Sequence, residues 1–317
     1  MDIKALLNKN KYGLTVFSVS AMLCLIYDGF ESALTLLCKL LLCVTVAVFL
    51  SPCLKQEKQM QSVTLPAFAF LSIIGCNVIF LTSDLHILLS LSAFFLSLFF
   101  SKKCKVLTPV FTGLCVLAMP LTLLILVPTV VVVQFIRNQK LFAVLSTITG
   151  VLAFVITKLL ETNVDFYAHQ GGAYYLWLHP VHFSKTHTEY LLQFLLCSLP
   201  LVVMALVYII KLITKERVVA GVAILLTSAL AIYGFSLCKS THTVFMILIP
   251  VFAGLVALSN EKGFREVIDE IGDFFAKHTF AFLLMLAFIA GVTMILDALP
   301  FESEFFSRST FIIFREE

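Results

Sequence analysis

The stretch LHILLSLSAFFLSLFFSKKCK, residues 85–105, decides how the rest of the chain is interpreted. Its apolar part, 85–101, has the length that a helix needs to cross roughly 30 Å of hydrocarbon. It is followed at once by Lys102, Lys103 and Lys105. An apolar run that ends in a basic loop is typical of a transmembrane helix whose loop lies in the cytosol.

Composition extends this interpretation to the whole chain. Of 317 residues, 60% are hydrophobic and only 13% are charged, and the mean hydropathy is +1.03. A soluble domain of this length would need a larger charged surface. We therefore predict an all-α polytopic integral membrane protein, a single transmembrane domain over residues 1–317 that binds membrane lipids and no nucleic acid.

Apolar runs of suitable length predict about eleven spans. The fifth and sixth are short and meet at Met119 and Pro120, so they are alternatively a tight hairpin that does not fully cross. The predicted spans are 14–27, 33–51, 63–82, 85–101, 106–119, 121–136, 141–160, 189–210, 218–237, 243–259 and 279–297.

Every second connection between these runs is basic, which predicts that those connections and the N-terminus are cytosolic and the C-terminus is outside. The other side then carries a long loop, 161–188, and a tail, 298–317. A charged segment with regularly spaced apolar residues, 260–278, is expected to lie along the cytosolic interface as an amphipathic helix, or to be a simple linker helix. The basic residues are Lys4, Lys9, Lys11, Lys55, Lys58, Lys102, Lys103, Lys105, Arg137, Lys140, Lys211, Lys215, Arg217, Lys262 and Arg265.

Charges inside or beside the spans are candidates for function, because burying a charge is costly unless it is paired or hydrated. Lys39 lies about two turns into the second run, and Asp28 and Glu31 lie at the mouth of the same hairpin. Lys39 has two interpretations: a ligand contact, or a structural lysine that pairs locally or extends to the interface. Further candidates on the predicted outer side are Asp84, His86, Lys158, Lys185, Lys239 and His242.

The segment HQGGAYYLWLHPVHFSKTH, residues 169–187, is polar, aromatic and rich in histidine. Zinc accepts three histidines, but Pro180 prevents a regular helix from aligning His179 with His182. We therefore predict no cofactor, and a divalent cation is the alternative, although no specific motif supports it. The loop 161–188 holds further candidates: Asp165 as a general base and His169 as a substrate-binding residue. Tyr175 and Trp177 form either an interfacial aromatic belt or a surface on which a sugar or isoprenoid stacks.

The run 83–140 resembles the core of the GT-C-type glycosyltransferases, a superfamily of polytopic membrane enzymes. A span begins near an Asp and ends in a basic loop, and a short apolar pair with Gly and Pro punctuation follows. The later run FSLCKSTHTVF, 235–245, is similar to a segment of those relatives that use polyprenyl-phosphate sugars. The matching residues are Asp84, Lys102, Gly113, Pro120, Pro128, Arg137, Phe235, Ser236, Lys239 and Pro250.

The resemblance implies inverting transfer of a sugar from a polyprenyl-phosphate donor to a hydroxyl on the outer face of a membrane, which we expect to be a bacterial plasma membrane. It also implies an acidic base in the first outer loop, for which Asp28 or Glu31 is the matching residue, while Lys239 stabilises the leaving phosphate. The family's first outer loop is long, whereas DGFES, 28–32, is short. The competing classes are a transporter or flippase for a lipid-linked or anionic solute, and a non-catalytic lipid-binding scaffold.

Overall fold

The computed structural model describes residues 33–50, 85–161, 199–214, 218–236 and 249–258, together with single positions between 261 and 284. Within these residues every regular element is a helix, which confirms the predicted all-α class. The helices are α2 (Ala33–Leu50), α5 (Leu85–Lys103), α6 (Leu107–Ala118), α7 (Thr122–Ile125), α8 (Val127–Ile136), α9 (Lys140–Glu161), α11 (Leu199–Thr214), α12 (Val218–Ser236) and α13 (Ile249–Leu258).

Two of these helices, Leu85–Lys103 and Lys140–Leu160, are long and apolar enough to cross a membrane. The predicted span 121–136 is divided into α7 and α8. The predicted spans 14–27 and 63–82 lie outside the described residues, and 279–297 has only single described positions.

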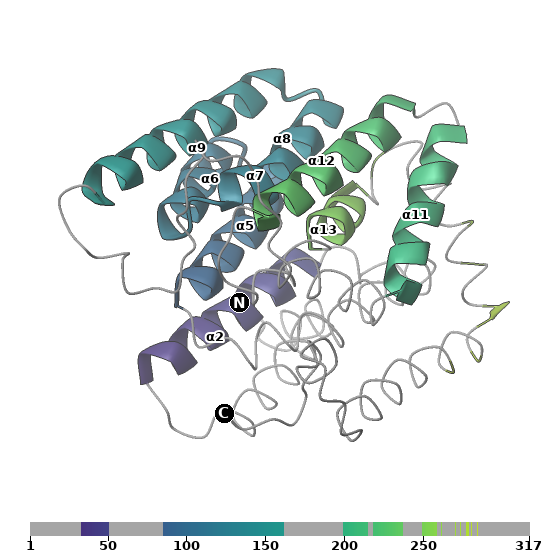
Figure 1. Cartoon of the computed structure of the whole chain (residues 1–317), viewed down its shortest axis with the longest axis horizontal. Helices are drawn as coiled ribbons and strands as arrows, with labels where there is room; N and C mark the ends of the chain where they lie inside the picture. The colour runs from purple at the N-terminus through teal and green to yellow at the C-terminus, as the bar shows by residue number, and fades with distance from the viewer. Residues whose placement is uncertain are drawn as a thin grey trace, which may run out of the picture.

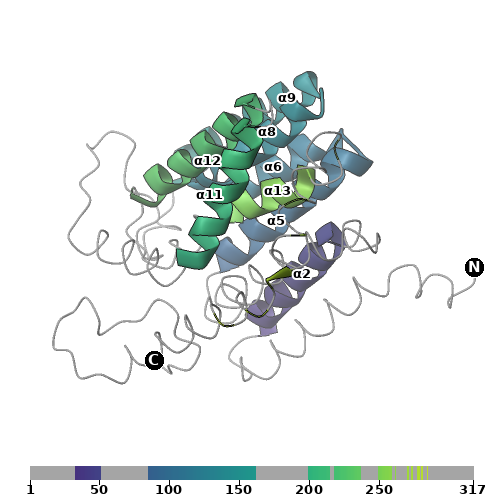
Figure 2. The same cartoon turned by 90° about the vertical axis from the view of Figure 1, so that its right-hand side faces the viewer.

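The helices pack around α5 and α8. On one side α5 contacts α2, and on the other it contacts α6, which in turn packs against α9. Helix α8 lies between α9 and α13, and α12 covers α7, α8 and α13, with α11 outside it (Figure 1). In the perpendicular view α2 lies below the other helices, next to α5 (Figure 2).

Helix α5 is an interior helix that carries several serines without exposing them. The hydroxyl of Ser90 donates to the carbonyl of Ile87 at 2.9 Å, and Ser97 donates to Phe94 at 2.8 Å. Such local bonds satisfy a polar side chain within its own helix. Ser90 and Ser97 are therefore satisfied within α5 itself.

Helix α9 has two contrasting faces. The inner face, which packs on α6 and α8, carries small or weakly polar residues, and the outer face carries large apolar ones. Membrane helices typically have small residues where they contact other helices and large apolar residues on the face that points outward. The inner residues are Ala143, Ser146, Gly150, Ala153 and Thr157; the outer ones are Leu141, Val144, Leu145, Ile148, Val151, Leu152, Val155, Ile156 and Leu159.

Helices α6, α7 and α8 form a hairpin that runs along α5. The tip of the hairpin meets the start of α5, because Nδ1 of His86 lies 2.9 Å from the carbonyl oxygen of Ala118. Its base meets the end of α5, because Arg137 and Gln139 both bind Ser101. His86 and Ser101 are about 22 Å apart along the helix axis. Although α6 is short, the hairpin thus follows most of the length of α5.

Candidate functional site

Lys39 lies inside the protein. It is in the early part of α2, and it is only 2% exposed. The same helix packs against α5, where the rings of Phe49 and Phe95 have their centroids 5.4 Å apart. Burying an ammonium group in apolar surroundings is costly unless an opposite charge or water accompanies it. A lysine at this position therefore needs a polar or charged partner.

A break in the hairpin lies at the opposite side of α5 from α2. Met119, which follows α6, is extended with φ −147° and ψ 101°, and the next residue is Pro120. The amide of Thr122 donates to Met119 at 3.0 Å, so the carbonyl of Ala118 loses its usual helical donor. Non-helical backbone at membrane depth is tolerated only where protein or a watery cavity satisfies it.

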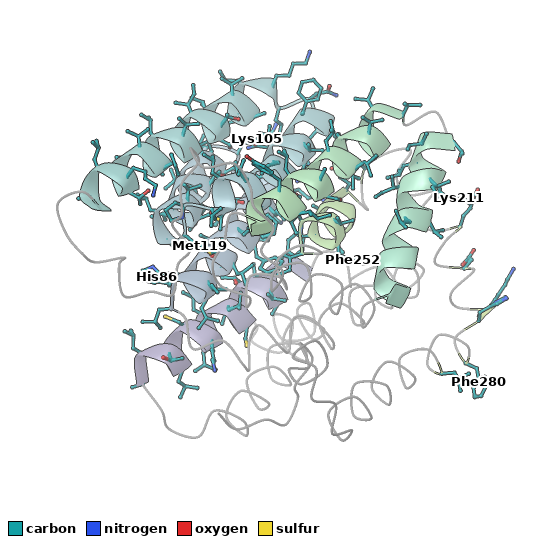
Figure 3. All side chains as sticks on the ribbon, viewed as in Figure 1. His86, Lys105, Met119, Lys211, Phe252 and Phe280 are labelled. Atoms are coloured by element: carbon teal, nitrogen blue, oxygen red, sulfur yellow. The ribbon has the colours of Figure 1, made fainter. Side chains whose placement is uncertain are left out.

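Two side chains satisfy this break. Nδ1 of His86 is 2.9 Å from the Ala118 oxygen; a carbonyl only accepts, so Nδ1 must carry the hydrogen. The hydroxyl of Thr122 lies 3.1 Å from the oxygen of Cys115 and 2.6 Å from that of Met119. Figure 3 shows His86 near Met119, at the start of α5. The tip of the hairpin is thus fixed by hydrogen bonds from α5 and α7.

A second polar cluster joins three helix ends, and we call it the Arg137 end of the bundle. Nε of Arg137 lies 2.9 Å from Oε1 of Glu261. Its other two nitrogens donate to the Ser101 hydroxyl in the last turn of α5 and to the Ala257 carbonyl in the last turn of α13. The side-chain amide of Gln139 adds a bond to the Ser101 carbonyl at 3.0 Å. Helices α5, α8 and α13 therefore all end on the same side.

The turn between α8 and α9 is closed by Asn138, whose φ is 57°. The amide of Asn138 donates to the carbonyl of Phe135 at 3.0 Å, and the amide of Gln139 donates to that of Gln134 at 2.9 Å. This is a left-handed helix C-cap, in which Asn is the usual substitute for Gly. The cap directs Arg137 toward α13 and Gln139 toward α5.

Of the predicted site residues, the structure describes Lys39, His86 and Lys158. They lie on α2, at the start of α5 and in the last turn of α9, where Lys158 is half-buried. The predicted catalytic carboxylates, Asp28 and Glu31, lie outside the described residues, so their distance from Lys39 stays untested. The predicted residues outside the described part of the chain are Asp28, Glu31, Asp84, Asp165, His169, Tyr175, Trp177, His179, His182, Lys185, Lys239 and His242.

The interhelical role of Arg137 was not predicted. Arg137 was recognised only as a basic loop residue and as part of the family resemblance. The burial of Gln134 and Gln139 was likewise not predicted, although glutamine next to an apolar run is a usable signal of an interior polar contact. Among the residues that the structure describes, no group of three or more His, Cys, Asp or Glu residues is placed to hold a metal ion.

Comparison with protein-family models, curated proteins and solved structures found no match for this chain.

Proposed function

We propose that this chain is a polytopic membrane glycosyltransferase of the GT-C type, which transfers a sugar from a polyprenyl-phosphate donor to an acceptor on the non-cytosolic face. In this proposal Asp28 or Glu31 takes the proton of the acceptor hydroxyl, and Lys39 and Lys239 stabilise the phosphate that leaves. The eleven spans, the cytosolic N-terminus and a bacterial plasma membrane belong to the same proposal.

The burial of Lys39 is the observation that supports this function most. A lysine ammonium is a compact charge that suits a phosphate. Its position in α2 is close in sequence to Asp28 and Glu31, which precede the helix. A carboxylate and a cation near one membrane face are the two charges that inverting transfer from a lipid phosphate requires.

The two faces of α9 support a location within lipid. Helix α9 has 22 residues, which gives a length of about 33 Å, similar to the hydrocarbon thickness. Its large apolar side chains stay exposed along this length. Helix α5 is also long and apolar enough to cross a membrane.

One observation favours a second candidate, a transporter or flippase for a lipid-linked or anionic solute. The hairpin of α6, α7 and α8 is interrupted at Met119 and again at Leu126. Secondary transporters often build substrate sites from such discontinuous helices. In the enzyme, the same break serves only to shape the bundle around α5.

The enzyme proposal is tested with the full chain in proteoliposomes that contain undecaprenyl phosphate linked to radiolabelled glucose or mannose. We expect the label to leave the donor for a lipid or water-soluble acceptor. Asp28→Asn combined with Glu31→Gln should abolish this transfer while the variant still binds undecaprenyl phosphate.

The same vesicles distinguish the alternative. Movement of intact labelled donor between leaflets without cleavage would favour the flippase and contradict the enzyme. Lys140→Met is a matched control: Lys140 is an exposed lysine at the Arg137 end, so its loss should leave transfer unchanged.

A further inference from the structure

Helices α6, α8 and α9 meet in a small apolar cluster. Its buried members are Val116, Val127 and Ala153, one from each helix. Gly150 allows this close approach, because a Cβ at that position would lie 3.1 Å from Leu123 Cδ1 and 3.8 Å from Val127 Cγ1. The cluster fixes which faces of the three helices oppose one another.

Toward the Arg137 end the same three helices carry polar residues instead. Thr108 on α6, Gln134 on α8 and Ser146 on α9 each lie about two turns from the apolar cluster. Helices α6 and α9 begin at this end and α8 ends there. The three polar residues therefore all lie on the same side of the apolar cluster. Side chains in a helix lean toward its N-terminus, which brings the Gln134 amide back along α8, level with Ser146.

A hydrogen bond confirms that these segments are adjacent. The hydroxyl of Thr149 lies 2.9 Å from the carbonyl oxygen of Pro109 and 3.1 Å from that of Ser146. The first turn of α6, which contains Thr108, therefore lies against the backbone of α9 at Ser146.

The polar atoms of this group lack partners. In the described part of the chain, the hydroxyls of Thr108 and Ser146 and both amide atoms of Gln134 are buried without a hydrogen bond. Native proteins satisfy nearly all buried polar atoms, either with protein or with ordered water. Several unsatisfied atoms between the same three helices indicate a small molecule that forms hydrogen bonds with them.

We propose that the space between α6, α8 and α9 is a binding site for ordered water, formed by Thr108, Gln134 and Ser146. The site offers both donors and acceptors and carries no formal charge, which matches a molecule that donates and accepts. A cation is disfavoured because none of the three side chains carries a negative charge. An anion is disfavoured because none of the three side chains carries a positive charge.

If water occupies this site, single and combined substitutions should change the thermal unfolding midpoint in opposite directions. Gln134→Met, Thr108→Val and Ser146→Ala should each lower the thermal unfolding midpoint of the full chain in detergent, because each leaves the water short of a partner. The triple variant should recover toward the parent, since an apolar lining no longer needs water. If the site is dry, each single change raises the midpoint and the effects add.

Two controls distinguish bound water from a general loss of packing and from a bound cation. Thr157→Val removes a buried hydroxyl of α9 that is already bonded within its helix, to Ala153 and Phe154, and should not couple to Gln134→Met. A midpoint that rises in sodium or potassium chloride but not in choline chloride would identify a cation and overturn the water site.

A measurement on the unmodified protein covers the case in which a variant does not fold. Hydroxyl radicals generated from water by X-rays oxidise side chains next to bound water. Val130, buried one turn before Gln134, should be oxidised although bulk water does not reach it. Leu88, an equally buried residue of α5, should remain unlabelled; equal labelling or none at Val130 would contradict the proposal.

Discussion

Arg137 and Glu261 form an ion pair whose Nε and Oε1 atoms are 2.9 Å apart, with the arginine side chain only 6% exposed and the glutamate 33%. The pair connects the end of α8 to the segment that follows α13. Because the same guanidinium also binds Ser101 and Ala257, a single side chain holds three helix ends.

We predict that Arg137→Ala lowers the free energy of unfolding by about 3 kcal/mol, because it leaves buried partners without their cation. Arg137→Lys should lose less, since it keeps the charge but not the planar set of donors. Glu261→Gln, which leaves the Ser101 and Ala257 contacts intact, is the control. Thermal unfolding can be followed with a thiol-reactive dye, because Cys38, Cys43 and Cys115 are buried. Equal losses for all three variants would contradict this account.

Asn138 provides a test of the α8–α9 turn. Its φ of 57° is poorly tolerated by β-branched residues, so Asn138→Val should destabilise the protein by about 1–2 kcal/mol. Asn138→Gly should be neutral or slightly stabilising. The same dye assay compares the two. If valine is tolerated as well as glycine, the left-handed cap does not exist in solution.

Gly221 tests the contact between α11 and α12. A Cβ there would lie 2.5 Å from Ile213 Cγ1 and 3.2 Å from the Ile209 carbonyl, and backbone atoms move little. Gly221→Ala should therefore cost about 1–3 kcal/mol through overpacking.

Gly113→Ala is the matched control for this substitution, because its nearest neighbours would be 3.7 Å away on Thr149. It should be tolerated or gain up to about 1 kcal/mol from helix propensity. The reverse order of the two midpoints would show that α11 and α12 are packed differently.

His86 holds the tip of the hairpin, so His86→Phe should cost about 1–3 kcal/mol by leaving the Ala118 carbonyl unsatisfied. His86→Gln retains a donor and should lose less. Hydrogen exchange followed by mass spectrometry should show faster exchange around Met119 in the phenylalanine variant. Unchanged exchange there would mean that Thr122 alone holds the break.

The long helices were predictable from sequence because their apolar runs end at charged or polar residues. The predicted spans 85–101 and 141–160 differ from α5 and α9 by only a few residues. The division of 121–136 was not predicted, although Pro128 provided a signal. Proline lacks an N–H and favours the first turn of a helix, and here it lies in the first turn of α8.

The polar contacts between helices were not predictable in the same way. Arg137 meets Ser101 and Glu261, which are 36 and 124 positions away in sequence. Hydrophobic periodicity fixes which segments are helical but not which helix ends meet. The burial of Lys39 was recognisable only as one of two interpretations, because a lysine early in an apolar run also suits an interfacial position.

The most direct test of the proposed function is transfer of labelled sugar from undecaprenyl phosphate by Lys39→Met and Lys140→Met in the same proteoliposomes. If Lys39 binds the donor phosphate, Lys39→Met should reduce transfer at least about tenfold, the equivalent of one charge-assisted contact. Lys140→Met should behave like the parent, and Lys39→Arg should restore part of the activity. Equal transfer by Lys39→Met and the parent, with both proteins folded, would contradict the proposal.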